Sequence, residues 1–182
     1  MGILKHLSLV LILMLGEISP GVALAQVDVS EYELKAAFVY QFATYAEWPP
    51  EAFESDDTPL RFGVLGSQVM ANNLEMLVEG QRLNGRPAEV RLLQQGDSLA
   101  GLHVLFISSG EQAAALLAEA PVRPLLTVTE TEPERWPPGS MINLQVVDEH
   151  VRFDVALPAT NAAGLRLSAR LLQVAQRVLP SP

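Results

Sequence analysis

The stretch LRFGVLG, residues 60–66, decides the fold expected of this chain. It is a short apolar run that ends at a glycine, and Ser67 then stands where it can cap the helix expected over QVMANNLEMLVEG, residues 68–80. A buried strand that leads directly into a helix is a building unit of α/β folds. The segments on either side show whether the unit is repeated.

Five further segments have the apolar, β-branched composition of strands. They are AEVRLL (88–93), LHVLFIS (102–108), LLTVTE (125–130), MINLQVV (141–147) and HVRFDVAL (150–157). The turn signal Asn84-Gly85 precedes the first of them, and a capping-box spacing at Ser109 and Gln112 opens a helix over residues 111–120.

The last two strands are separated by only Asp148 and Glu149. They should form an antiparallel hairpin, because parallel neighbours need a crossover connection. The other strands are apolar throughout, which is typical of a parallel sheet covered on both faces. We therefore expect a three-layer α/β fold, with a mostly parallel sheet of about six strands, a C-terminal antiparallel hairpin, and helices on both faces.

The N-terminus has the pattern of a secretory signal peptide. Lys5 precedes an apolar run over residues 7–15, and a small-residue cleavage site follows at residues 23–25. The run is shorter than the roughly 17 residues that a transmembrane helix needs. We expect cleavage after residue 25, export to the periplasm, and a single domain over residues 26–182 that does not insert into the membrane. A buried N-terminal helix is the alternative interpretation.

The overall charge argues against a nucleic-acid partner. The chain has 12 Lys and Arg against 21 Asp and Glu, a net charge of −9, whereas binding to phosphates needs clustered cations. Cysteine is absent from the sequence, which rules out an acyl-cysteine lipoprotein anchor.

Candidates for catalysis or metal binding are few. His103 lies in an apolar strand, where a hydrogen-bonded core histidine is the simpler interpretation, and His150 follows the hairpin turn and should be solvated. Glu130, Glu132 and Glu134 alternate at a strand end and are more typical of a solvated surface than of a cation site. We therefore expect no catalytic residues, no metal site and no cofactor.

Two strand-to-helix junctions are candidate ligand sites, because doubly wound sheets bind ligands at such junctions. Free N–H groups at the start of a helix favour a small anion or solute. Neither junction contains a GxGxxG or Walker motif, so turn geometry and helix capping are the alternative roles. The candidate ligand-binding residues are Gly66, Ser67, Ser108, Ser109 and Gly110.

The first predicted helix contains AFVYQFATYAEWPP, residues 37–50, and ends at the proline pair. Ser30 and Glu33 have capping-box spacing at its start. Its polar residues are scattered around the helix, so nearly its whole surface must be covered. Either the helix is buried between the sheet and a C-terminal helix, or its aromatic residues with polar tips contact a second chain. The candidate contact residues are Tyr40, Tyr45 and Trp48.

A last helix is predicted over residues 165–179. Arg166, Arg170 and Arg177 are spaced so that they share one face of that helix. The face is either a solvated surface or a site for a partner that bears carboxylates, because guanidinium groups form two-point contacts with carboxylates.

Six segments of the chain occur in a recognisable order: LKAAFVYQFATYAEWP, FGVLG, NGRPAEVRLL, GLHVLFIS, GSMINLQVVDEHVRFDVAL and LRLSARLLQVA. Together they resemble the YfiR family of periplasmic proteins, over about residues 31–178. The most specific pieces are the helix that ends at Trp48-Pro49 and the segment SARLL, residues 168–172.

The resemblance implies a periplasmic regulator without enzymatic activity, built as an α/β protein that tends to dimerise. The best-known member of the family binds the periplasmic sensor part of an inner-membrane diguanylate cyclase and holds it inactive, and is itself sequestered by an outer-membrane, OmpA-like lipoprotein. Characterised relatives carry redox-responsive disulfides. This chain has Leu102 where a cysteine is common and has no cysteine elsewhere, so control through a disulfide is excluded.

The sequence leaves three candidate functions for the chain. The first is a negative regulator of cyclic di-GMP signalling, and hence of biofilm formation, that acts by binding a cyclase. The second is a periplasmic solute-binding module that uses the two strand-end junctions. The third, an enzyme, lacks a nucleophile beside a base.

Overall fold

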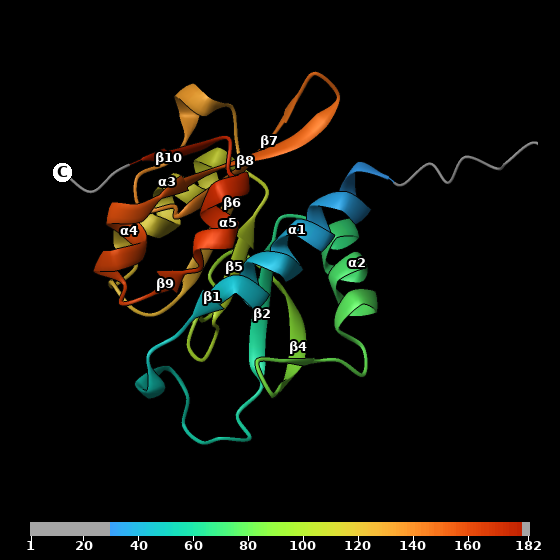
Figure 1. The fold of residues 1–182 in the computed structure, drawn as a ribbon, viewed down its shortest axis with the longest axis vertical. Coiled ribbons are helices and arrows are strands. Elements are labelled where there is room, and N and C mark those ends of the chain that lie inside the picture. Colours follow the sequence, from blue (N-terminus) through green and yellow to red (C-terminus); the bar gives the residue numbers. More distant parts are fainter. Residues whose placement is uncertain (1–29, 180–182) are drawn as a thin grey trace, which may run out of the picture.

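The structure is a computed structural model that describes residues 30–179. The predicted signal peptide lies outside the described residues. Within them, the chain forms an eight-stranded sheet in the order β10-β8-β7-β6-β5-β2-β4-β3 (Figure 1). Its strands are β2 (Leu60–Leu65), β3 (Arg82–Leu83), β4 (Arg86–Leu93), β5 (Val104–Ile107), β6 (Leu126–Glu130), β7 (Ile142–Val147), β8 (His150–Ala156) and β10 (Arg177–Leu179).

The sheet is mostly parallel, as the sequence predicts. Strands β4, β2, β5, β6 and β7 all run parallel, and β10 runs parallel to β8. Antiparallel pairing occurs at β3–β4 and in the β7–β8 hairpin. Asp148 and Glu149 form the turn of the hairpin with φ of 49° and 62°, and positive φ at both central positions is the mark of a type I′ turn.

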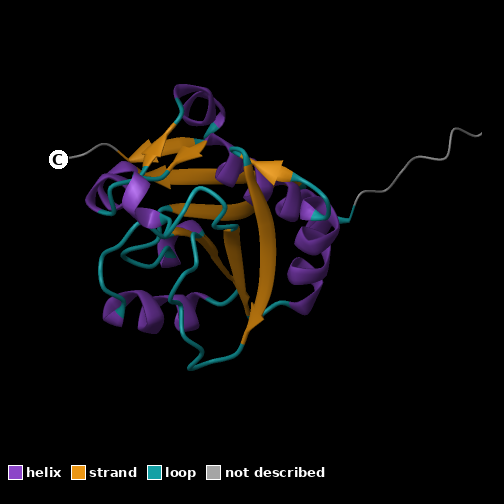
Figure 2. Ribbon diagram, turned by 90° about the horizontal axis from the view of Figure 1, so that it is seen from below, coloured by secondary structure: helices purple, strands orange, loops and turns teal. Residues whose placement is uncertain are grey.

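Helices cover both faces of the sheet, which confirms the three-layer α/β prediction (Figure 2). Helix α2 (Gln68–Val78) connects β2 to β4, whereas α3 (Gly110–Glu119) connects β5 to β6 in the opposite direction along the sheet. Because parallel crossovers are right-handed, reversing the direction places the two helices on opposite faces. Helix α1 (Glu31–Tyr45) packs beside α2.

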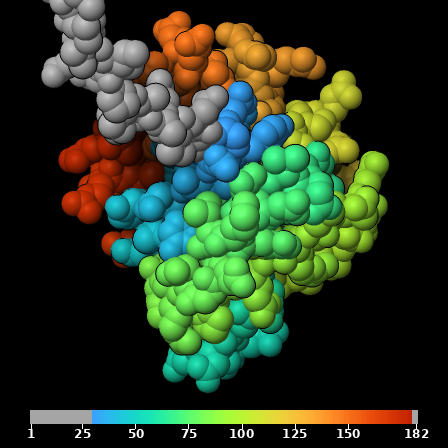
Figure 3. Space-filling view, turned by 90° about the vertical axis from the view of Figure 1, so that its right-hand side faces the viewer, coloured from blue at the N-terminus to red at the C-terminus, as the bar shows by residue number. Residues whose placement is uncertain are grey.

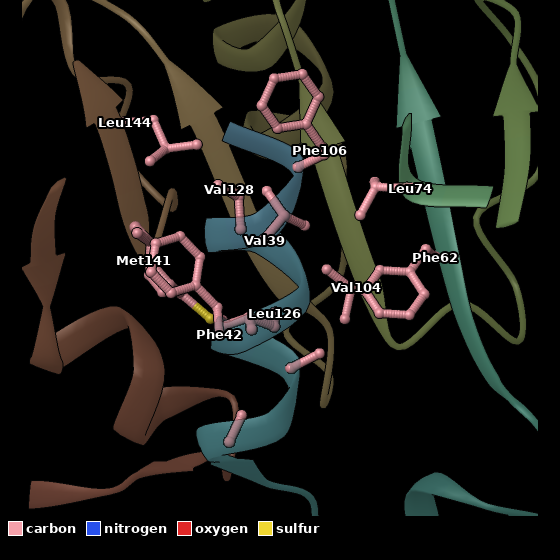
Figure 4. Packing of buried hydrophobic residues seen from close by; sticks show 14 of the residues in the cluster. Val39, Phe42, Phe62, Leu74, Val104, Phe106, Leu126, Val128, Met141 and Leu144 are labelled. Atoms are coloured by element: carbon pink, nitrogen blue, oxygen red, sulfur yellow. The ribbon is translucent and has the colours of Figure 1, made fainter. Parts of the chain in front are cut away.

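The larger core lies between the sheet and the α1 and α2 layer. Val39 and Phe42 of α1 lie among sheet residues that include Leu126 and Val128 (Figure 4). The Phe42 and Phe153 rings are 4.8 Å apart between centroids, which joins α1 to β8. A smaller core on the other face packs β5 against α3.

Helix α2 forms the outer surface of this layer (Figure 3). It exposes apolar side chains there, with Val69 52%, Met76 65% and Leu77 37% accessible. No helix within residues 30–179 combines the length and the apolar character needed to cross a bilayer.

The prediction of one helix over residues 165–179 is wrong. The chain there forms α4 (Leu157–Ala162), β9 (Arg166–Leu167), α5 (Ala169–Val174) and then β10. Gly164 has a φ of +72°, a conformation that ends helices. Strand β9 pairs with β1 (Ala46–Glu47), and the Ser168 side chain accepts a hydrogen bond from the Leu171 N–H and so starts a new helix.

Candidate functional site

The small sheet of β1 and β9 brings the end of α1 to the C-terminal part of the chain. Ala46 is opposite Leu167 and Glu47 is opposite Arg166. The Ser168 N–H donates to the Tyr45 carbonyl at 2.9 Å. Two of the predicted contact regions, residues 45–48 and the segment that begins at Arg166, are therefore neighbours in the fold.

A hollow of about 480 Å³ opens beside this small sheet. Tyr45, Glu47 and Trp48 line one part of it, and Phe53 and Arg86 line another. Among the residues that line the hollow, Leu60 lies at the amino end of the parallel strand β2. The hollow is therefore at the end of the parallel strands opposite to the glycine junctions.

Phe53 and Arg86 form a stacked wall of the hollow. The Phe53 ring stacks on His103 with 4.4 Å between centroids, and the Arg86 guanidinium lies 3.8 Å from the Phe53 centroid. Arg86 also donates to the carbonyls of Ser55 and Asp56 at 2.7 and 2.8 Å. The guanidinium N–H groups of Arg86 thus hold the loop between η1 (Pro50–Ala52) and β2, which gives this arginine a structural role.

His103 is a core histidine, as the sequence predicts. Its Nδ1 accepts a hydrogen bond from the Arg61 N–H, and its Nε2 donates to the Ala52 carbonyl, each at 3.1 Å. Burial lowers the pKa of His103. A neutral ring with both nitrogens occupied is not available to act as a base on a substrate.

Trp48 is half-buried, and its indole N–H is the unusual group of the hollow. The Nε1 atom is shielded, and no group within residues 30–179 accepts a hydrogen bond from it. Shielded polar groups are nearly always paired. Trp48 lines the hollow, so a shift of its side chain on binding would let this N–H donate to an acceptor on a partner.

The predicted contact residues do not form a single group. Tyr45, Trp48 and Arg166 gather around the β1–β9 sheet, whereas Tyr40 lies outside the hollow, on α1. Arg166 approaches Glu47 at 3.7 Å, with both side chains more than two-thirds exposed, and such a surface pair adds little stability.

The predicted arginine stripe is not formed, because its members lie on three different elements. Arg166 is in β9 and Arg170 is exposed in α5. Arg177 is in β10, where its guanidinium contacts the buried carboxylate of Asp154 at 2.6 Å. The hydrogen bond to Asp154 raises the pKa of Arg177, so this arginine ties the last strand to the sheet.

The predicted ligand-binding residues do come together, at the carboxyl ends of β2 and β5. The strand order reverses between these two strands, which is the point where doubly wound sheets bind ligands. The Ser108 N–H donates to the Leu65 carbonyl at 3.1 Å. A Cβ atom on Gly66, whose φ is +88°, would overlap the Ser108 hydroxyl. The junction itself is thus filled by the chain's own side chains.

The hydroxyls of Ser67 and Ser109 cap α2 and α3, as the alternative role predicts. The full capping box predicted at Ser109 is not formed, because the Gln112 side chain makes no hydrogen bond to the Ser109 N–H.

The side-chain carbonyl of Gln112 is shielded and accepts no hydrogen bond within residues 30–179. Gln112 borders a hollow of about 350 Å³ between α3 and residues 93–99. In the sequence, only the position of Gln112 at the start of a helix indicates that its side-chain carbonyl could belong to a site.

Glu130 differs from the predicted solvated surface. It forms an ion pair with Lys35, whereas Glu132 and Glu134 are exposed as expected. No cluster of three or more His, Asp or Glu side chains suited to a metal ion occurs within residues 30–179.

Two comparisons with known proteins bear on this arrangement. The family model DUF4154, described as YfiR/HmsC-like, matches residues 32–176. A search of curated proteins gives no significant match. The matched residues include the whole of α1 except its first residue, every strand of the large sheet except β10, and the β1–β9 contact beside the hollow.

Proposed function

Because the chain belongs to the YfiR/HmsC-like family, we propose that it is a periplasmic signalling regulator. In this proposal it binds the periplasmic sensor domain of an inner-membrane diguanylate cyclase, holds the enzyme inactive and lowers cytoplasmic cyclic di-GMP. The chain has no catalytic role of its own and acts by docking.

The unpaired indole N–H of Trp48 is the main observation that supports a docking site at this hollow. Trp48 lines a hollow of about 480 Å³ whose other lining residues include the half-buried Tyr45 and Phe53, and its own N–H is shielded and unpaired within residues 30–179. Tyrosine and tryptophan anchor many interfaces, because each buries a large apolar ring and offers one polar atom. Arg166 and Glu47 at the rim supply exposed charges that can select a partner.

The cellular test is a deletion of the gene followed by measurement of cyclic di-GMP. The level should rise in the deletion strain and return to normal when the wild-type gene is restored. A level that is the same with and without the gene, in cells that contain a diguanylate cyclase with a periplasmic domain, would remove the cyclase from the proposal.

The site is tested by comparing Trp48→Phe with Trp136→Phe. Trp136 is also half-buried with a shielded, unpaired indole N–H, but it lies between β6 and β7, outside the hollow. Loss of one hydrogen bond should weaken binding to the purified sensor domain about 3- to 10-fold for Trp48→Phe. Trp136→Phe should bind as the wild type does. Equal affinity for all three proteins would exclude Trp48 from the interface.

Two finer parts of the proposal concern assembly. We propose a homodimer, and an outer-membrane OmpA-like lipoprotein as a second partner that sequesters the regulator. Light scattering of the purified chain measures its molar mass and so tests the homodimer. Co-purification with the candidate lipoprotein, with and without Trp48→Phe, shows whether the two partners compete for the same surface.

The second candidate function is solute binding at the switch point of the sheet. The unpaired Gln112 carbonyl and the adjacent 350 Å³ hollow favour it. A ligand that binds only the native chain must raise its melting temperature. A thermal-shift screen of small polar metabolites, repeated with Gln112→Leu, tests this function, and a screen without any shift argues against it.

A further inference from the structure

A second group of hollows lies on the α3 side of the molecule, at the amino ends of β6 and β7. One has a volume of about 300 Å³ and is lined mainly by apolar groups, among them Leu117, Val122, Met141 and Ala162. A shallower one of about 340 Å³ adjoins it and shares Ala120, Pro121 and Arg123. The first volume is at the lower end of the range of about 300–1,000 Å³ that holds small-molecule ligands.

Among residues 30–179, Arg123 is the only one with a cationic side chain that lines these two hollows. It is half-buried, and its guanidinium donates one hydrogen bond, to the Leu99 carbonyl. No carboxylate within residues 30–179 comes within 4 Å of it. Glu119 lines the shallower hollow but does not reach it.

A half-buried charge without a counter-charge is unusual, because desolvation of an ion is costly unless an opposite charge is near. Burial lowers the pKa of Arg123, which is the direction expected when desolvation is not offset by an anion. Four of the five guanidinium N–H groups make no hydrogen bond within the described residues. The group is therefore poised to bind an anion at the mouth of an apolar pocket.

We propose that this pocket binds a short aliphatic carboxylate, with the acid group on Arg123 and the alkyl chain between α3 and α4. The charge of the ligand follows from Arg123, and its apolar body follows from Leu117, Val122 and Met141. Arginine fits a carboxylate because its planar fork makes two parallel hydrogen bonds. The 300 Å³ pocket shares no lining residue with the Trp48 hollow or the Gln112 hollow, although the shallower hollow beside it shares Leu99, Leu116 and Glu119 with the latter. The proposal therefore does not depend on the proposed regulatory function.

Titration calorimetry on the purified chain with butanoate, hexanoate, octanoate and 1-hexanol tests the proposal. Each added methylene that is buried should strengthen binding about fourfold, until the pocket is full. Hexanoate should bind more tightly than 1-hexanol, because the alcohol lacks the charge.

Three variants locate the site. Arg123→Gln should weaken hexanoate binding at least about tenfold and leave 1-hexanol unchanged. Ala162→Phe places a ring over the pocket from an exposed position of α4 and should weaken both ligands. Arg152→Gln removes an exposed arginine of β8 and should change neither. Circular dichroism melting shows that each variant is folded.

Several results would overturn the proposal. They are the absence of saturable hexanoate and octanoate binding in the millimolar range, equal affinity for the acid and the alcohol, and wild-type affinity in folded Arg123→Gln. None of these measurements involves a cyclase, so a negative result leaves the proposed function untouched. Equally, an unchanged cyclic di-GMP level leaves this pocket untouched.

Discussion

Lys35 of α1 forms an ion pair with Glu130 at the carboxyl end of β6, although 95 positions separate them in the sequence. The lysine is only 1% exposed, and Glu31 pairs with it from one turn earlier in the helix. Burial opposes the lysine charge, but the two carboxylates outweigh burial and raise the pKa of Lys35. This cluster fixes the first half of α1 to the sheet.

Lys35→Met should lower the free energy of unfolding by about 1–3 kcal/mol, because it leaves the partly shielded Glu130 carboxylate without its cation. The loss should be smaller than for a fully buried pair, since Glu130 remains 23% exposed. A pKa raised above its usual value of 10.5 means that the pair's contribution is complete below pH 10.5 and is lost as the pH rises through the raised pKa. Urea denaturation at pH 7 measures the change.

The matched control is the double variant Lys35→Met with Glu130→Gln. It removes both charges and should recover part of the lost stability, because no unpaired carboxylate remains on β6. If the single and double variants are equally unstable, packing of the lysine stem matters and the ion pair does not.

His103 should make folding sensitive to mild acid. Burial lowers its pKa in the folded chain below the usual value of 6.5, so the unfolded chain binds the proton first as the pH falls. The contribution of the neutral ring is therefore complete above about pH 7.5 and decreases as the pH falls through about 6.5, by at most about 1.4 kcal/mol per pH unit. Urea midpoints at pH 7.5 and pH 5.5 measure this slope.

His103→Asn should reduce that pH dependence, whatever its effect on stability at pH 7.5. His150→Asn removes the exposed histidine of the hairpin and should keep the wild-type slope. If the free energy of unfolding of His103→Asn depends on pH as strongly as that of the wild type, other groups cause the acid sensitivity.

The parts of the fold that the sequence predicts are those with local signals. The segment 60–66 and the other apolar runs form strands, and Ser67 and Ser109 cap the helices that follow them. The prediction of one helix over residues 165–179 is wrong because the helical spacing of leucine and arginine is also compatible with short elements. Pairing of Arg166 with Glu47 across the small sheet decides between them, and that partner lies far away in the sequence.

In the candidate site, too, local sequence patterns indicate some residues, whereas contacts between distant segments determine the state of others. The sequence indicates Trp48 because it stands at the end of an unusually apolar run, although helix α1 ends earlier, at Tyr45, and β1 follows it. It indicates the switch-point glycines because they stand at junctions that follow strands. The burial of Lys35 and the unpaired state of Arg123 and Gln112 depend on contacts between distant segments, and nothing in the local pattern indicates them.

Gly66→Ala should destabilise the chain by about 1–3 kcal/mol. The residue has a φ of +88°, and an added Cβ atom would also overlap the Ser108 hydroxyl. Gly96→Ala is the control, because Gly96 has a similar φ of +92° but nothing within 4 Å of the added atom. Thermal melting should therefore show a larger loss at position 66. Equal losses would mean that the junction yields easily and that only backbone strain matters.

Arg177→Gln should loosen the last strand. Asp154 is fully buried, and its Oδ2 atom accepts hydrogen bonds from Arg177 and, at 3.0 Å, from Gln145. Without Arg177 a buried carboxylate keeps only the Gln145 amide, so the melting temperature should fall and the amides of β10 should exchange faster with solvent. Arg170→Gln removes an exposed arginine of α5 that makes no ion pair within residues 30–179 and should change neither. If hydrogen exchange in β10 is the same in both variants, main-chain pairing with β8 alone holds the strand in place.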